Sequence, residues 1–154
     1  MRPLVLSDRD GAAKLVLDDP GGSILESILR DQARSDADGQ GLDLETFFSL
    51  GIRIAEALGK LHAQGLVHKD IKPANILIAS DARSVRFTGF GFASVLPRHR
   101  LAPEPVEAME GTIAYMAPEQ TGRMNRSVDS RSDLYSLGVT FFEMLTGRLP
   151  FVSD

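Results

Sequence analysis

With 154 residues and an apolar fraction of 43%, the chain has the size and composition of one globular domain with a sizeable core. A net charge of -4 gives no electrostatic case for binding nucleic acid or an acidic membrane, and the absence of cysteine excludes disulfides, thiolate metal sites and a cysteine nucleophile. No apolar run has the form of a signal peptide or approaches the roughly 18 residues of a membrane span, so we expect a cytoplasmic domain.

The first predicted elements are short. Apolar runs at residues 4–6 and 14–17 flank a polar turn, a pattern that predicts two strands. The run from Asp18 to Gly22 contains proline and two glycines and ends the second strand. We expect a short helix over residues 23–30 and, because residues 31–41 are polar and rich in Asp and Gly, a flexible connection after it.

The longest amphipathic pattern follows. Apolar residues recur every three or four positions over residues 44–62, which predicts a helix with Asp43 as its N-cap and Gly65 as its end. Residues 76–78 and 85–88 are apolar or β-branched runs around a polar turn and predict a small hairpin.

The last predicted helix spans residues 129–147. Its apolar positions form one stripe and predict a buried central helix: Leu134, Leu137, Gly138, Phe141, Phe142 and Leu145. Ser130 and Asp133 have the spacing of a capping box, and Gly147 marks the end of the helix.

The residues with the clearest chemistry lie between the long helix and the hairpin, in the octet His68-Lys-Asp-Ile-Lys-Pro-Ala-Asn75. Asp70 can accept a proton from an attacking hydroxyl, Lys72 can neutralise a phosphoryl group, and the Asn75 side-chain oxygen can bind Mg²⁺. Pro73 restricts the backbone, so we expect a rigid loop. The alternative is an ordinary polar loop.

This octet resembles the catalytic loop of eukaryotic-type protein kinases, which is His-Arg-Asp, four residues and Asn, with Lys69 in place of the arginine. The run Gly-Thr-Ile-Ala-Tyr-Met-Ala-Pro-Glu at 111–119 resembles the end of a kinase activation segment, and Asp-Leu-Tyr-Ser-Leu-Gly at 133–138 also resembles the family. The details are most similar to kinase domains at the N-terminus of large bacterial proteins that continue with an ATPase region and a sensor histidine kinase.

The resemblance implies an α+β, protein kinase-like fold, mainly the helical large lobe with the last strands of the small lobe, truncated at both ends. Residues 1–22 would be the end of the small lobe and the hinge, and residues 23–154 the large lobe up to its central helix. Residues 89–119 would be the activation segment, with its proline-rich middle at 97–105 as an exposed loop.

The implied activity is that of a serine/threonine protein kinase, with ATP and Mg²⁺ as cofactors and a protein substrate or signalling partner. Asp70 would be the base, Lys72 would steady the γ-phosphate, and Thr112 would bridge the two; Lys72 and Thr112 also mark the serine/threonine class. The resemblance implies catalytic residues Asp70, Lys72 and Thr112; nucleotide-binding residues Leu17, Asp18, Asn75 and Leu77, with Asn75 also binding the metal; and structural residues His68, Glu119 and Asp133.

Three departures predict that catalysis is impaired and put both ATP and Mg²⁺ in doubt. Gly89 stands where the family has the metal-binding aspartate, and glycine has no side-chain oxygen. No glycine-rich phosphate loop is present, and Lys14 lies too near Asp18 to be the lysine that pairs with the phosphates. Because Lys69 is a weaker, non-bidentate donor than arginine, we expect no strong dependence on loop phosphorylation.

Two alternatives remain. The chain could be a non-catalytic, pseudokinase-like binding or signalling module, and other domains of a larger signalling protein could be its partners. A small-molecule phosphotransferase of the antibiotic-kinase type shares the loop but does not explain the Met-Ala-Pro-Glu run at 116–119. A nucleic-acid patch is disfavoured, because the arginines among acids and serines are typical of a solvated face: Arg123, Arg126 and Arg131.

Overall fold

The computed structural model describes residues 3–9, 12–17, 21–35, 40–81, 83–95, 113–122 and 127–151. Asp18, Thr112 and the segment 97–105, which carry predictions made above, lie outside these ranges. In the described part of the chain, no helix combines the length and apolar character that a membrane span requires.

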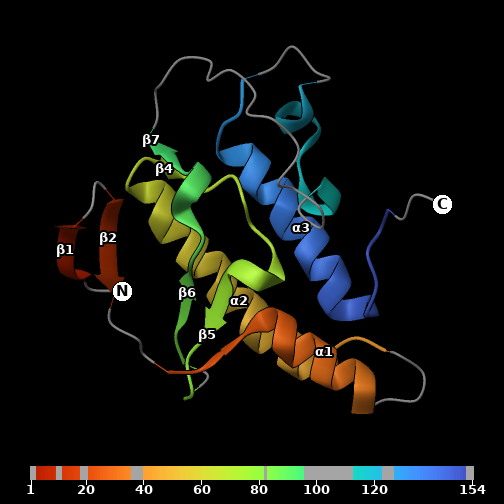
Figure 1. Cartoon of the computed structure of the whole chain (residues 1–154). Coiled ribbons are helices and arrows are strands. Elements are labelled where there is room, and N and C mark those ends of the chain that lie inside the picture. Colours follow the sequence, from red (N-terminus) through yellow and green to blue (C-terminus); the bar gives the residue numbers. More distant parts are fainter. Residues whose placement is uncertain are drawn as a thin grey trace.

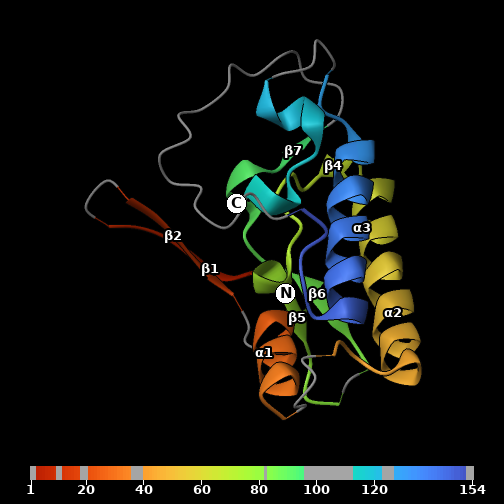
Figure 2. The ribbon, with the colours of Figure 1, turned by 90° about the vertical axis from the view of Figure 1, so that its right-hand side faces the viewer.

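The described helices are α1 (Leu25–Ser35), α2 (Leu44–Ala63) and α3 (Ser130–Thr146). The strands are β1 (Pro3–Arg9), β2 (Ala12–Leu17), β3 (Ser23–Ile24), β4 (Leu66–Val67), β5 (Ile76–Ile78), β6 (Val85–Phe87) and β7 (Ser94–Val95). They pair as β1 with β2, as a sheet in the order β3-β5-β6, and as β4 with β7. Helices α2 and α3 lie side by side, with the β5–β6 hairpin against α2 and α1 near the foot of the hairpin (Figures 1 and 2).

Helix α2 confirms its prediction. The Asp43 carboxylate accepts a hydrogen bond of 3.0 Å from the Thr46 backbone N–H, so it satisfies a donor that the first helical turn leaves free. The helix ends before Gly65, whose φ of +73° lies in the left-handed region that glycine adopts at little cost. Leu50, Ile54 and Leu58 share the buried face at a spacing of four.

Helix α1 differs from its prediction at both ends. It begins at Leu25, after the short strand β3, and continues to Ser35, so the expected flexible connection is wrong for residues 31–35. Composition misled the prediction, because the polar residues here form the solvent face of a helix. Arg30 and Glu26 form an ion pair of 3.2 Å one turn apart on that face, while Leu25 is fully buried.

Helix α3 corrects two predictions. Its N-cap is Asp129, which accepts a hydrogen bond from the Arg131 N–H, and Asp133 belongs to no capping box. The predicted apolar stripe is only partly buried, because Leu137 belongs to the core and Phe141 packs against it while Leu134 is 55% exposed. Thr140 and Met144, which the stripe did not include, are fully buried. Other positions of the predicted stripe are exposed as well: Gly138, Phe142 and Leu145.

The buried face of α3 is rich in hydroxyls, which periodicity of apolar residues cannot detect. Ser136 Oγ donates to the Ser132 carbonyl at 3.2 Å, and Thr140 Oγ1 donates to the Ser136 carbonyl at 2.9 Å. These bonds inside the helix satisfy the hydroxyls, so they can face the core without the cost of an unpaired polar group.

The predicted hairpin is confirmed, with Ile76 opposite Phe87 and Ile78 opposite Val85 in β5 and β6. The catalytic-type octet is anchored between α2 and this hairpin by Ile71, which is 1% exposed and belongs to the main core. The buried core comprises Leu25, Leu42, Leu50, Ile54, Leu58, Ile71, Ile76, Ile78, Phe87, Leu137 and Met144. The octet is therefore held by apolar packing as well as by hydrogen bonds.

Candidate active site

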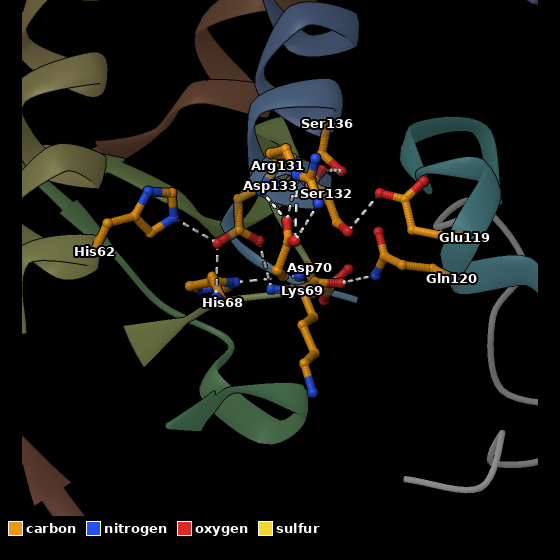
Figure 3. Close-up of polar contacts among 11 residues, drawn as sticks. His62, His68, Lys69, Asp70, Glu119, Gln120, Arg131, Ser132, Asp133 and Ser136 are labelled. Atoms are coloured by element: carbon orange, nitrogen blue, oxygen red, sulfur yellow. Dashed lines mark hydrogen bonds and ion pairs between the residues drawn. The ribbon is translucent and has the colours of Figure 1, made fainter. Parts of the chain in front are cut away.

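The site is organised by the Asp133 carboxylate, which projects from the first turn of α3 toward the loop (Figure 3). Its Oδ1 accepts a hydrogen bond of 2.7 Å from the Lys69 backbone N–H. Its Oδ2 accepts one of 2.8 Å from the His68 backbone N–H and one of 2.8 Å from His62 Nε2. Asp133 is fully buried, so these three donors compensate a charge that would otherwise be costly, and they fix the loop to α3.

His68 is fully buried and joins the loop to the strand that precedes Gly89. Its Nε2–H donates to the Thr88 carbonyl at 2.9 Å, and its Nδ1 accepts from the Asp70 backbone N–H at 3.3 Å. Burial is the main cause that lowers the pKa of His68 below its usual value. The ring is therefore neutral at pH 7, with the proton on Nε2, since a carbonyl can only accept.

Lys69 has a φ of +67°, the only positive φ of a non-glycine residue in the described ranges, and it costs roughly 1–2 kcal/mol. Hydrogen bonds to both its backbone N–H and its backbone carbonyl hold Lys69 in this conformation. The Lys69 N–H donates to Asp133, and its carbonyl accepts a hydrogen bond of 2.8 Å from Gln120 Nε2.

Gln120 was not among the predicted site residues. Its Nε2 donates to Lys69, and its Oε1 accepts from the Ala117 N–H at 3.1 Å, so one amide joins the Met-Ala-Pro-Glu segment to the loop. The only sequence signal was its position directly after that motif. Figure 3 shows Gln120 reaching toward the loop from the turn η5 (Pro118–Thr121).

Asp70 is 8% exposed, and its two oxygens have different surroundings. Oδ2 accepts a hydrogen bond of 2.7 Å from Asn75 Nδ2, which also donates to the Asp70 carbonyl at 2.8 Å. Oδ1 lies 3.1 Å from Lys72 Nζ but accepts no aligned hydrogen bond in the described structure. Oδ1 thus has unused acceptor capacity, which is what removal of a proton from a hydroxyl requires.

The residues around Asn75 do not fit the Mg²⁺ that the kinase resemblance implies. The ideal Cβ of a side chain at Gly89 would lie 2.6 Å from both Cγ and Oδ1 of Asn75. No cluster of three Asp, Glu or His side chains that could hold a metal exists in the described part of the chain. Mg²⁺ prefers carboxylate and water oxygens in octahedral geometry, and residue 89 supplies none.

Glu119, predicted to be structural, has a hydrogen-bond partner on α3. Its Oε1 accepts a hydrogen bond of 2.7 Å from Ser132 Oγ. A second link from the same region to α3 is the 2.6 Å hydrogen bond that Tyr115 donates to Glu143. Burial is the main cause that raises the pKa of both Tyr115 and Glu143 above their usual values.

Of the remaining predicted nucleotide-binding residues, the structure describes Leu77 and the backbone of Leu17. Leu77 is half-buried in β5, opposite Ile24 of β3. Leu17 is the last residue of β2, and Asp18 and Thr112 lie outside the described residues. Their roles, and the division of the chain at residue 22, stay predictions.

Comparison with known proteins agrees with this architecture. A family model described as "Protein kinase domain" matches residues 15–154. A probable serine/threonine-protein kinase of Clostridium perfringens is 32% identical over 151 residues, which cover 98% of this chain and 20% of that protein. The serine/threonine-protein kinase PknB of Mycobacterium tuberculosis is 40% identical over 99 residues, which cover 64% of this chain and 15% of that protein.

A serine/threonine-protein kinase of Myxococcus xanthus is 42% identical over 102 residues, which cover 64% of this chain and 14% of that protein. The chain thus spans a fifth or less of the length of these three relatives. The predicted α+β, protein kinase-like fold is confirmed. The chain belongs to the protein kinase domain family, and the proteins that it resembles are serine/threonine kinases of bacteria.

Proposed function

We propose that the site transfers a phosphoryl group from ATP to serine or threonine hydroxyls of a protein, and that transfer by this chain alone is weak. The observation that carries the proposal is the pair formed by Asp70 and Lys72, with Oδ1 and Nζ 3.1 Å apart on a loop that Asp133 holds. Protein kinases as a family use ATP and Mg²⁺. A proton acceptor and a cation stand together at Asp70 and Lys72, whereas residue 89 supplies no side-chain oxygen for a metal.

In this proposal, the acceptor hydroxyl of the substrate donates its proton to Asp70 Oδ1 as it attacks the phosphorus atom. The Lys72 ammonium stabilises the negative charge on the phosphoryl oxygens. Asn75 holds the other carboxylate oxygen, so the proton-accepting one keeps a constant direction. Gln120 keeps the Ala117 segment at a fixed distance from the loop, which favours a peptide substrate over a small molecule.

A second candidate function is a non-catalytic binding or signalling module. Gly89 favours it, because a kinase that lacks the metal carboxylate loses a major source of charge stabilisation in the transition state. In either case, we expect the chain to work in the cytoplasm and with other domains of a larger signalling protein.

The test is a single-turnover assay with radiolabelled ATP and a serine-rich protein, compared between the natural chain and Asp70→Asn. We expect trace label on serine or threonine that disappears in Asp70→Asn. The matched control is Asp81→Asn, an exposed carboxylate remote from the site, which should keep the trace activity.

Thermal unfolding with ATP separates the two candidates further. A nucleotide at a hundredfold excess over its Kd stabilises the folded state by about 2.7 kcal/mol. Absence of both label transfer and ATP-linked stabilisation would contradict the catalytic proposal and favour the module.

A further inference from the structure

We propose that Asn75 and Gly89 form a packed pair in place of a divalent-cation site, so that Asn75 positions Asp70 and the site holds no Mg²⁺ of its own. The inference deepens the proposed function by giving the cation requirement of the same site, and it rests on that function for what the site does. The steric and hydrogen-bonding arguments hold for the chain whether or not transfer occurs.

Hydrogen bonds fix both the side chain and the backbone of Asn75. Its side-chain Nδ2 donates to the Asp70 carbonyl at 2.8 Å and to Asp70 Oδ2 at 2.7 Å. Its backbone N–H donates to the Lys72 carbonyl, and its carbonyl accepts from the Thr88 N–H, both at 2.9 Å. The two side-chain bonds fix the plane of the amide, and turning it would break both of them, one to a carboxylate, so only Oδ1 in its present position could meet a cation.

Gly89 makes this arrangement possible. Its φ of +76° places the missing side chain toward Asn75, where an ideal Cβ would lie 2.6 Å from Cγ and Oδ1 and 2.7 Å from Nδ2. Real Cβ atoms do not approach other heavy atoms so closely. The observed Asn75 rotamer and any side chain at residue 89 therefore exclude each other.

The charges around Asp70 also disfavour a bound divalent cation. The Lys72 ammonium already stands 3.1 Å from Oδ1, so the carboxylate has a positive partner without a metal. A divalent cation at this oxygen would be repelled by that ammonium. Among the described residues, the Asp70 carboxylate would be its only charged protein ligand there, because residue 89 supplies no second carboxylate.

The test is direct cation binding, with Mn²⁺ alone as the probe, because Mn²⁺ takes the same oxygen ligands and broadens NMR signals of nearby nuclei. In the natural chain, we expect no saturable broadening centred on the Asn75 side-chain amide up to millimolar Mn²⁺. Saturable binding that broadens the Asn75 and Asp70 signals first would overturn the proposal.

Two aspartate variants provide the matched comparison. Gly89→Asp adds a carboxylate and displaces Asn75, and aspartate tolerates a positive φ better than most residues. Gly91→Asp adds the same charge two residues away, where an ideal Cβ meets no atom within 4 Å. We expect Gly89→Asp to bind Mn²⁺ about tenfold more tightly than Gly91→Asp, which is about 1.4 kcal/mol.

The readout needs neither nucleotide nor phosphoryl transfer, so a chain that proves inactive in the kinase assay leaves this inference intact. If Gly89→Asp does not fold, the Mn²⁺ titration of the natural chain still tests whether the site binds a cation. The proposal would be refuted if the natural chain and Gly89→Asp bound Mn²⁺ with equal affinity and the broadening was centred on residue Asn75 in both.

Discussion

The contact between Gly89 and Asn75 makes a quantitative prediction for the substitution Gly89→Ala. Alanine at a φ of +76° costs roughly 1–2 kcal/mol relative to glycine. Its methyl group would overlap the Asn75 amide at 2.6 Å, so the side chain must move and lose its hydrogen bonds to Asp70. The neutral bond is worth about 0.5–1.5 kcal/mol and the charged one about 1.5–3 kcal/mol.

Partial recovery of these hydrogen bonds and the lower entropy of an unfolded chain with alanine offset part of the loss. We therefore expect Gly89→Ala to lower the free energy of unfolding by about 3 kcal/mol, which is roughly 6–12 °C in Tm for a domain of this size. Urea denaturation and a thermal scan measure both quantities. Gly91→Ala is the control, because its Cβ would meet no atom within 4 Å, and it should change stability by less than about 1 kcal/mol. Equal stability of Gly89→Ala and the natural chain would refute the argument.

Three further predictions test the support of the loop. Asp133→Ala should cost about 3–5 kcal/mol in urea denaturation, because three donors lose their buried acceptor; a loss below 1 kcal/mol would contradict this role. Asp129→Ala should cost about 1 kcal/mol through loss of the α3 cap, whereas Ser130→Ala should be nearly neutral, and the reverse order would restore the predicted capping box. The pKa of His68 is lower in the folded state than in the unfolded state, so below pH 6.5 the unfolded state binds more protons at this residue than the folded state does. The free energy of unfolding should therefore fall as the pH drops from 7 toward 5. His68→Gln should have a shallower slope in a pH series of unfolding curves, and an unchanged slope would exclude His68 as its source.

Local signals in the sequence were sufficient for several elements. Helix α2 and its N-cap could be predicted because the capping bond of Asp43 and the spacing of the apolar residues both act within one or two helical turns. The β5–β6 hairpin followed from two apolar runs around a polar turn. The octet from His68 to Asn75 carried the family signal, since its chemistry lies in consecutive residues.

The predictions that failed depended on which surface another element covers. The apolar stripe of α3 located only part of the buried face, Leu137 and Phe141, because the core also accepts Ser136 and Thr140 once their hydroxyls bond within the helix. The polar end of α1 looked like a loop because composition does not distinguish the solvent face of a helix from a connection. No rule based on neighbouring residues resolves either case.

By itself, the sequence determined the family and the order of the three helices and the hairpin, and it predicted which residues would accept a proton or neutralise a phosphate. Only the tertiary structure decided how these residues are held. Asp133 meets the backbone of Lys69 across 64 positions, Gln120 meets it across 51, and Asn75 packs against Gly89. Such contacts depend on how α3, the loop and the hairpin pack against one core, and that packing is set by the whole chain rather than by any segment.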